Sequence, residues 1–505
     1  MRELISHLPV RAAARFGGDP ALTLAAERTL DFATIEDRVA RCAGGLAARG
    51  LGRGERVVLH LPNGWEWIVA YYAIARLGAV VVPANILLSP SEVAFLATDA
   101  QAFAVIAPGE RLAAVREAAG DIPFLAIPLE GEGDDGYRAL LNGRPQPPVD
   151  QDPDELFTIG YTSGTTGRPK GAMLSHRNIF ASTAMTATIH VRRRGESVLT
   201  ALPFPHVYGN VVMNAAFLAG MRLVVMERFD PATALRLIGA ERITLFEGVP
   251  TMYYQMLTEA GMDRADLSSL ERCTVGGQTM PVASIEEVER RFGCPLLELW
   301  GMTEVAGPAT SHSPYWPAHH GSIGLPFPGM EVRIADLDRP DREAPAGTAG
   351  ELRIRGPLVM RGYWRNPAAS AEVLDAGGWL ATGDVAERDE QGYLRIVDRR
   401  KDMIITAGYN VYPAELEQVL ARHPAVAMAA VASVPDAEKG ELAKAYIVLR
   451  PGATADATAI EAHCRQYLAA YKVPRLYAFV TDLPKTSTGK ILRRALREAL
   501  PATHA

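Results

Sequence analysis

The residues with the clearest chemical potential lie in one glycine- and hydroxyl-rich stretch, residues 161–171, which reads YTSGTTGRPKG. Glycines let backbone N–H groups approach an anion closely, hydroxyls add donors, and Lys170 adds a point charge. The stretch therefore predicts a loop that binds phosphate. It differs from the loop of P-loop kinases, because Pro169 stands where that motif requires its second glycine. A flexible surface turn is the weaker interpretation, since the stretch is poor in charge and combines three glycines with five hydroxyls, Tyr161 included.

The segments on either side of this loop must hold it in place. Glu155–Ile159 has the pattern of a short buried strand, and Ser175 is a suitable N-cap for a helix that runs through Asn178 to about Ile189. The sequence thus predicts that a strand, the loop and a helix together form a cradle for phosphate.

Strand and helix patterns alternate on both sides of this element. In the first 130 residues, strands are predicted at 56–61, 79–83 and 103–107, and helices at 32–49, at 66–77 and after Ser89. Glu92, three residues after Ser89, completes a capping box. A second series has strands at 198–202, 222–226 and 245–249, and helices at 232–240 and 251–260. This βαβ rhythm predicts an α/β fold with parallel, doubly wound sheets.

The pattern changes twice in the last third of the chain. From Gly329 onward, short alternating strands such as 331–334 and 350–354 predict a small antiparallel barrel. After the charged run 398–402 comes a compact α+β unit of about a hundred residues, a size that folds alone. We therefore predict an N-terminal domain over 1–400 and a C-terminal domain over 401–505.

Composition narrows the class of protein. The chain has 505 residues, 48% of them hydrophobic and 22% charged, as in a globular protein with more than one core. A net charge of −6 argues against a general nucleic-acid binder. The four cysteines lack metal-ligand spacing, the N-terminus does not resemble a signal peptide, and no apolar run reaches membrane-span length. These features predict a cytoplasmic protein with reduced thiols and no membrane span.

Seven further segments carry polar or glycine-rich motifs. Alone, most would pass for ordinary turns or solvated charges, and His206 for a satisfied histidine in a proline-rich loop. The segments are 202–209, 276–279, 299–304, 379–384, 398–402, 407–410 and 483–490. Together with 161–171, and in this order, they resemble the adenylate-forming enzymes: acyl-CoA synthetases, luciferases and non-ribosomal adenylation domains. Residues 402–413, DMIITAGYNVYP, look most like bacterial fatty-acyl-CoA ligases.

The resemblance implies a role for each motif in binding ATP, Mg²⁺ and coenzyme A. Trp300 would stack on adenine, Thr303 would bind the α-phosphate, Glu304 would bind Mg²⁺, and Asp384 would accept hydrogen bonds from the ribose hydroxyls. The residues expected to bind ATP or coenzyme A are Thr162, Ser163, Gly164, Thr165, Thr166, Gly167, Lys170, Gly277, Gln278, Thr279, Trp300, Gly301, Met302, Thr303, Asp384, Arg399, Gly408, Tyr409 and Lys490.

The catalytic residues implied by the resemblance are Lys490, Glu304, Thr162 and His206. Lys490 would contact the substrate carboxylate and the α-phosphate, and His206 would lie where the acyl pocket meets the thiol tunnel. Gly408 and Tyr409 would line the pantetheine tunnel, and Lys401 would be the hinge about which residues 402–505 rotate between two steps. Gln278 departs from the usual Gly-Gly-Ala of its motif, which bears on the size of the acyl pocket.

The implied reaction is that of an ATP-dependent acid–CoA ligase. A carboxylate and ATP form an acyl-adenylate and pyrophosphate, and the acyl group then passes to CoA with release of AMP. Such catalysis depends on positioning and charge neutralisation and needs no protein nucleophile. A dead nucleotide sensor is disfavoured because Lys490 and Glu304 are both present.

The acid is expected to be a fatty acid. Segment 202–209 lacks the acidic residue with which amino-acid activators bind an ammonium group, and the apolar run 211–217 would either wall an acyl pocket or pack in the core. An aryl acid, a short dicarboxylic acid and a carrier-protein acceptor remain alternatives.

Residues 484–490 also resemble the segment through which bacterial acyl-CoA synthetases are inactivated by lysine acetylation. Acetylation would remove the positive charge of Lys490. The resemblance therefore implies a lysine acetyltransferase or deacetylase that acts on Lys490.

Overall fold

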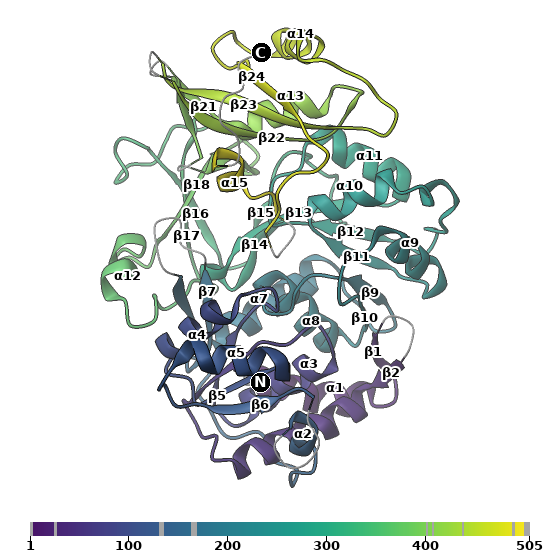
Figure 1. Cartoon of the computed structure of the whole chain (residues 1–505), viewed down its shortest axis with the longest axis vertical. Helices are drawn as coiled ribbons and strands as arrows, with labels where there is room; N and C mark the ends of the chain where they lie inside the picture. The colour runs from purple at the N-terminus through teal and green to yellow at the C-terminus, as the bar shows by residue number, and fades with distance from the viewer. Residues whose placement is uncertain are drawn as a thin grey trace.

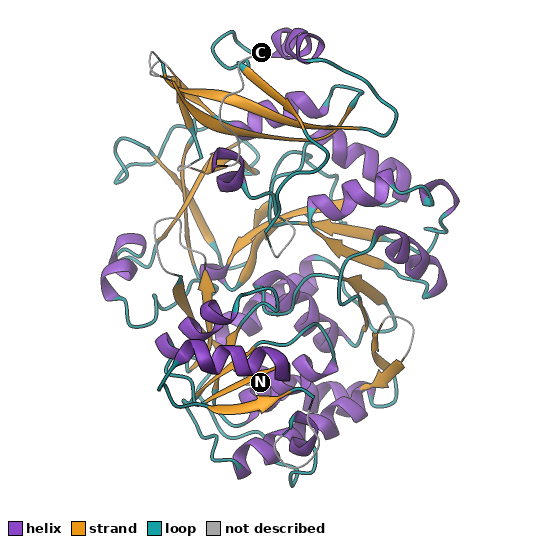
Figure 2. Ribbon diagram, viewed as in Figure 1, coloured by secondary structure: helices purple, strands orange, loops and turns teal. Residues whose placement is uncertain are grey.

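The computed structural model describes residues 4–24, 28–130, 136–162, 169–399, 402–406, 409–436, 439–486 and 490–498. Figure 1 shows an elongated molecule with a six-stranded sheet near its lower end and the C-terminal sheet at its upper end. Helices cover the sheets of the lower and middle parts (Figure 2).

The lower sheet has the strand order β6-β5-β3-β4-β7-β8. Its strands are β3 (Arg56–Leu59), β4 (Val80–Pro83), β5 (Ala104–Ala107), β6 (Leu125–Pro128), β7 (Leu156–Thr162) and β8 (Lys170–Ser175). The first four and β7 are parallel. The near-continuous apolar runs of β3, β4 and β5 are buried on both faces, as parallel sheets require. The helices between them are α3 (Trp65–Arg76), α4 (Pro90–Asp99) and α5 (Gly109–Ala119). The capping box predicted at Ser89 and Glu92 is present.

The predicted order of strand, phosphate loop and helix is wrong at one point, because strand β8 lies between the loop and the helix. The sequence led us to expect the phosphate loop to run directly into a helix, but Lys170–Ser175 pairs antiparallel with β7, with Thr162 opposite Lys170. The loop therefore connects the two strands of a hairpin. We missed β8 because a six-residue segment containing a glycine has too little periodicity to be recognised. The helix itself is confirmed as α7 (His176–Ile189), with the predicted Ser175 cap.

The second sheet has nine strands in the order β15-β14-β13-β12-β11-β9-β10-β1-β2. Its middle is parallel, as predicted, and β2, β14 and β15 pair antiparallel at its two ends. The strands are β1 (Pro20–Leu24), β2 (Arg28–Asp31), β9 (Ser197–Thr200), β10 (Arg222–Val225), β11 (Leu245–Gly248), β12 (Arg272–Val275), β13 (Leu296–Met302), β14 (Gly307–Ser311) and β15 (Leu325–Pro326).

Helices pack beside these two sheets. The amphipathic pattern predicted at 32–49 is α2, and the apolar run 211–217 lies inside α8. The bounds are α1 (Leu8–Phe16), α2 (Phe32–Ala48), α6 (Tyr137–Leu140), α8 (Val207–Ala219), α9 (Pro231–Ala240), α10 (Pro250–Thr258) and α11 (Val282–Phe292).

The antiparallel region begins near Gly329, as predicted, with four strands in the order β16-β17-β18-β19. They are β16 (Glu331–Ala335), β17 (Gly350–Arg355), β18 (Leu380–Arg388) and β19 (Leu394–Arg399), and α12 (Pro367–Val373) lies beside them. The strand pairs of the described residues leave this sheet open between β16 and β19, where the sequence predicted a small antiparallel barrel.

The C-terminal part forms its own sheet and its own cores. The sheet contains β20 (Ile404–Thr406), β21 (Tyr409–Val411), β22 (Val426–Asp436), β23 (Gly440–Leu449) and β24 (Leu476–Phe479), with helices α13 (Pro413–Ala421), α14 (Ala457–Tyr467) and α15 (Arg493–Glu498). Two apolar clusters lie wholly within residues 404–496, and two others within residues 5–394. The predicted domain boundary at 400/401 falls outside the described residues and stays a prediction.

Candidate active site

Asp384 on β18 is held by two neighbouring side chains. Its Oδ2 accepts a 2.8 Å hydrogen bond from the indole Nε1 of Trp300 on β13. Its Oδ1 lies 3.3 Å from Nε of Arg399, which stands directly opposite it on β19. Asp384 as a whole residue is 7% exposed, and both of its carboxylate oxygens are oriented before any ligand binds. The nine-stranded sheet and the four-stranded sheet therefore meet at Trp300, Asp384 and Arg399, which the sequence assigned to nucleotide binding.

Lys490 reaches this cluster from the far end of the chain. Its side chain lies against Gly277, where an added Cβ would stand 2.9 Å from Cε and 3.6 Å from Nζ of the lysine. Gly277 also has a φ of +89°, which disfavours a side chain there. Burial, and to a lesser degree the charge of Arg399, lowers the pKa of Lys490 to about 8, while the charge of Asp384 opposes the shift. Lys490 is thus an ammonium that is easier to deprotonate than usual.

His206 also lies within electrostatic range of Lys490. It is the N-cap of α8, and its Nδ1 accepts a hydrogen bond of 3.3 Å from the backbone N–H of Tyr208. Burial, and then the charge of Lys490, lowers the pKa of His206 to about 3. The imidazole is therefore neutral at physiological pH, and it can serve as a polar wall but not as a cation.

Glu304 lies in the short helix η3 (Thr303–Val305), directly after β13. It is 6% exposed, and its Oε1 accepts a 2.9 Å hydrogen bond from the hydroxyl of Tyr363. Burial raises the pKa of Glu304. Tyr363 was not among the predicted residues, because nothing local in its aromatic turn points to a contact with a glutamate 59 residues away.

This arrangement fits Mg²⁺. Among the described residues, no group of three or more His, Cys, Asp or Glu side chains could hold a metal. A site with one carboxylate suits Mg²⁺, which binds one or two carboxylates and takes its other ligands from phosphates and water. Glu304 would hold the ion, and a cation beside it would stabilise the anionic form that burial disfavours.

The hairpin of β7 and β8, whose loop is predicted to bind phosphate, lies close to Thr303 and Glu304. Thr303 packs on β7, since a Cβ added to Gly160 would lie 2.7 Å from its Cγ2. Thr162 donates a long hydrogen bond of 3.4 Å to the carbonyl of Lys170. The Lys170 ammonium stands 3.7 Å from Oε2 of Glu372 and 5.4 Å above the ring of Tyr363. The predicted residues Ser163, Gly164, Thr165, Thr166 and Gly167 lie outside the described part.

Other predicted residues lie at the edge of this cluster or away from it. Gly301 and Met302 are on β13, paired with β14. Thr279 is exposed, and the carboxamide of Gln278 hydrogen-bonds to the backbone of Ile491. Tyr409 is 56% exposed on β21 and stacks on Tyr471 with ring centroids 4.6 Å apart. Gly408 and Lys401 lie outside the described residues.

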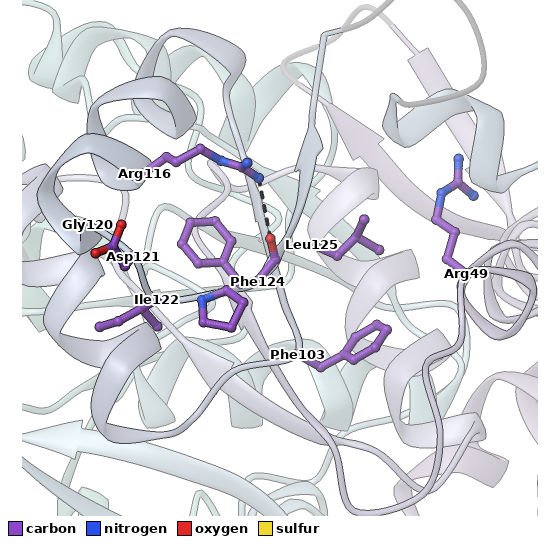
Figure 3. A pocket seen from close by; sticks show the side chains of 9 residues that line it. Arg49, Phe103, Arg116, Gly120, Asp121, Ile122, Phe124 and Leu125 are labelled. Carbon is purple, nitrogen blue, oxygen red and sulfur yellow. Dashed lines mark hydrogen bonds between the residues drawn. The ribbon is translucent and has the colours of Figure 1, made fainter.

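A surface hollow of about 670 Å³ is found elsewhere, beside the edge strand β6 (Figure 3). Phe103, Ile122 and Phe124 contribute apolar side chains to it, and Arg116 donates a hydrogen bond of 3.4 Å to the carbonyl of Phe124. None of its lining residues belongs to the cluster around Lys490 and Asp384.

Comparison with known proteins finds similarity over nearly the whole chain. Residues 10–364 match the model of the AMP-binding enzyme family, and residues 415–490 match that of the AMP-binding enzyme C-terminal domain. The chain is 36% identical over 530 residues to a long-chain-fatty-acid–CoA ligase of Bacillus subtilis, covering 98% of this chain and 94% of that protein.

A second relative and two solved structures widen the range of acids. A 3-[(3aS,4S,7aS)-7a-methyl-1,5-dioxo-octahydro-1H-inden-4-yl]propanoyl:CoA ligase of Mycobacterium tuberculosis is 36% identical, over 95% of this chain and 96% of that one. ATP-bound MatB from Rhodopseudomonas palustris superposes with a TM-score of 0.90 at 31% identity, covering 98% of both chains. The anthranilate CoA ligase AuaEII, in complex with anthranoyl-AMP, gives a TM-score of 0.92 at 28% identity, covering 98% of this chain and 97% of that one.

Proposed function

Because the chain belongs to the family of AMP-binding enzymes and is an AMP-forming acid–CoA ligase, we propose that it activates a fatty acid at the cluster around Lys490. The observation that carries the proposal is the place of Lys490. A lysine from the last sixteen residues of the chain lies on Gly277 and within electrostatic range of Asp384, Arg399 and His206.

In the first half-reaction, a carboxylate oxygen of the acid attacks the α-phosphorus of ATP, and the bond to the bridging oxygen of pyrophosphate breaks. Like charges repel in this approach, so a cation at the reacting atoms gives the greatest assistance. Lys490 supplies that cation. Asp384, already oriented by Trp300 and Arg399, accepts hydrogen bonds from the ribose hydroxyls and fixes the α-phosphate beside the lysine. Glu304 would hold Mg²⁺, which when bound would supply further neutralisation of phosphate charge.

In the second half-reaction, the thiol sulfur of CoA attacks the carbonyl carbon of the adenylate. The bond from that carbon to the AMP oxygen breaks, the thiol proton passes to solvent, and AMP leaves. His206 stands at the start of α8 as a neutral imidazole, so it can border the thiol's path without competing for the anionic groups.

The fatty acid is supported by the B. subtilis relative. On α8, which begins directly after His206, Met213 and Phe217 pack in the hydrophobic core, and Phe217 contacts the rings of Phe32 and Tyr72. A ring-bearing or polar acid is the second candidate. The Tyr208 hydroxyl on the first turn of α8 is 2.6 Å from Oγ1 of Thr274, and Glu247 lies within electrostatic range. Such buried polar groups could meet a carbonyl or hydroxyl of the acid.

Measurement of CoA-dependent AMP release tests the proposal, with a series of fatty acids of increasing length, benzoate, anthranilate, malonate and a bicyclic propanoate as substrates. We expect the highest kcat/KM with a fatty acid and free CoA. A preference for an aryl or dicarboxylic acid, or for a phosphopantetheinyl carrier protein over CoA, would overturn the proposed substrate but not the ligase reaction.

Acetylation of Lys490 is proposed as a control of this site. An acetylated lysine cannot neutralise the α-phosphate. In the structure the lysine side chain lies against Gly277, so the modifying enzyme must act when the C-terminal part has moved away. A cytoplasmic location is proposed with it. The structure contributes only that no helix among the described residues is long and apolar enough to cross a membrane.

A further inference from the structure

Two glutamine side chains form hydrogen bonds across the contact between the C-terminal part and the rest of the chain. One glutamine lies on each side of this contact, and each binds backbone groups of the opposite side. Gln278, which follows β12, accepts a 2.9 Å hydrogen bond from the N–H of Ile491 and donates one of 3.4 Å to the carbonyl of the same residue. Gln418 on α13 accepts one of 3.0 Å from the N–H of Val282 and donates one of 3.4 Å to the carbonyl of Met280.

The first of these contacts lies beside the site. Gln278 is the neighbour of Gly277, and Ile491 is the neighbour of Lys490. The side chain of Lys490 lies on Gly277, so the hydrogen-bonded pair and the lysine contact are adjacent along both segments. A carboxamide carries a donor and an acceptor at one end, which matches the N–H and C=O of one peptide residue. Gln278 therefore fixes the backbone position from which the long, flexible lysine stem extends.

The second contact completes a helix end. The N-cap of α11 is Pro281, which makes no side-chain cap hydrogen bond. The first N–H groups of a helix have no partner within the helix. The Gln418 carboxamide supplies one for Val282, which is the first residue of α11. An ion pair of 2.8 Å between Arg450 and Glu287 adds to the same contact, but it is partly exposed and contributes little.

We propose that Gln278 and Gln418 are positioning residues for adenylate formation. They hold the C-terminal part in the arrangement that places Lys490 beside Asp384, and so they raise the share of molecules that are competent for the first half-reaction. The proposal rests on the role given to Lys490 under the proposed function. It also explains why Gln278 stands where the motif usually has an alanine, because an alanine side chain can form neither of the two hydrogen bonds to Ile491.

The two half-reactions should respond differently to loss of these contacts. The contacts stabilise one arrangement only, so their loss lowers the population of that arrangement and leaves the other unaffected. Removing the two hydrogen bonds of one carboxamide should reduce adenylate formation roughly tenfold. Thioester formation from supplied acyl-adenylate and CoA should stay constant or increase. A merely structural role would lower both half-reactions together.

The test uses Gln278→Met, Gln418→Met and the double variant in the full-length enzyme, since methionine keeps the length of glutamine without its polar groups. Gln466→Met, at an exposed position on α14, is the matched control. ATP–pyrophosphate exchange measures the first half-reaction, and thioester formation from supplied acyl-adenylate measures the second. The midpoint of thermal unfolding shows whether each variant is folded.

We expect slower exchange in both single variants, a larger effect in the double variant, and no change in Gln466→Met. Unchanged or faster thioester formation is expected of Gln418→Met, because Gln418 is not among the residues assigned to ATP or coenzyme A. The inference is overturned if exchange stays within twofold of the parent enzyme in folded Gln278→Met and Gln418→Met, or if both half-reactions fall equally in Gln418→Met. Lys490→Ala distinguishes a failure of the role proposed for Lys490 from a failure of the role proposed for the two glutamines. If that variant retains exchange, the role of Lys490 is wrong; if it loses exchange while the glutamine variants keep it, only the present inference fails.

Discussion

Trp300 donates its indole N–H to Oδ2 of Asp384 over 2.8 Å, which joins two residues that the sequence assigned to different parts of the nucleotide. The carboxylate that is expected to receive the ribose is thereby oriented by the aromatic residue that is expected to meet the adenine. The 3.3 Å contact of its other oxygen with Arg399 completes the arrangement. One side chain is thus expected to have two effects on ATP binding: the contact of its ring with the adenine and the orientation of Asp384.

These two effects of Trp300 can be separated by mutation. Trp300→Phe keeps an aromatic ring and removes the N–H. We expect the KM for ATP in pyrophosphate exchange to rise about fivefold to tenfold, as for a lost hydrogen bond to a charged group, with a smaller effect on kcat. Tyr253→Phe is the control, because it loses a buried 2.6 Å hydrogen bond to the carbonyl of Thr274 elsewhere. An unchanged KM for ATP in Trp300→Phe would contradict the orientation of Asp384 by the indole.

The hydroxyl of Tyr363 should matter for the metal requirement. It donates to Oε1 of Glu304 and so fixes the carboxylate expected to hold Mg²⁺. Partners of this kind change metal affinity by about 10-fold to 100-fold when removed. Tyr363→Phe should therefore raise the Mg²⁺ concentration needed for half-maximal exchange, with activity recovered at high Mg²⁺. Tyr137→Phe, which loses a 2.7 Å hydrogen bond to the carbonyl of Glu66, should leave the Mg²⁺ dependence unchanged.

Glu304→Gln should abolish turnover without unfolding the protein. The amide oxygen can still accept from Tyr363, but it carries no charge for a metal. Burial raises the folded-state pKa of Glu304, so its ionised form costs stability at pH values above its ordinary pKa. The neutral variant should accordingly have an equal or higher midpoint of thermal unfolding. Near-normal exchange at saturating Mg²⁺ would rule out the assigned role of the carboxylate.

Adenylate formation should decline at alkaline pH because of Lys490. Its pKa is lowered to about 8, chiefly by burial. The ammonium is present below that pKa and is lost as the pH rises through it, so kcat/KM for exchange should fall about tenfold per pH unit above pH 8. Lys490→Arg keeps its charge throughout this range, and whatever activity it retains should lack the decline. A flat profile of the parent enzyme up to pH 10 would show that Lys490 does not limit the reaction as free ammonium.

The sequence predicted the parts of this site that depend on local pattern. The caps at Ser89 and Ser175 and the parallel strands follow from short-range rules, and the structure confirms them. The contacts between Trp300 and Asp384 and between Tyr363 and Glu304 join residues 84 and 59 positions apart. Gln278 and Ile491 lie still further apart, at 213 positions. No periodicity or motif encodes such pairs, because they arise only when segments far apart in the sequence pack together.

The position of Lys490 leads to a prediction about the order of the two half-reactions. The lysine occupies the site, whereas Tyr409 on β21, expected to line the thiol path, stacks on Tyr471 and is 56% exposed. One arrangement cannot easily serve both steps, so the C-terminal part is expected to rotate between them. Lys490→Ala should then lose exchange and still convert supplied acyl-adenylate to thioester.

Variants on the thiol side should behave in the opposite way. Gly408→Leu would place a side chain in the loop expected to border the pantetheine, and Lys401→Pro would restrict φ at the expected hinge. Both should make adenylate and stall before CoA, which a quenched reaction would show as acyl-adenylate that accumulates without thioester. Both positions lie outside the described residues, so these variants test the hinge independently of the contacts seen around Lys490. Equal loss of both half-reactions in Lys490→Ala, Gly408→Leu and Lys401→Pro would mean that one fixed arrangement performs the whole reaction.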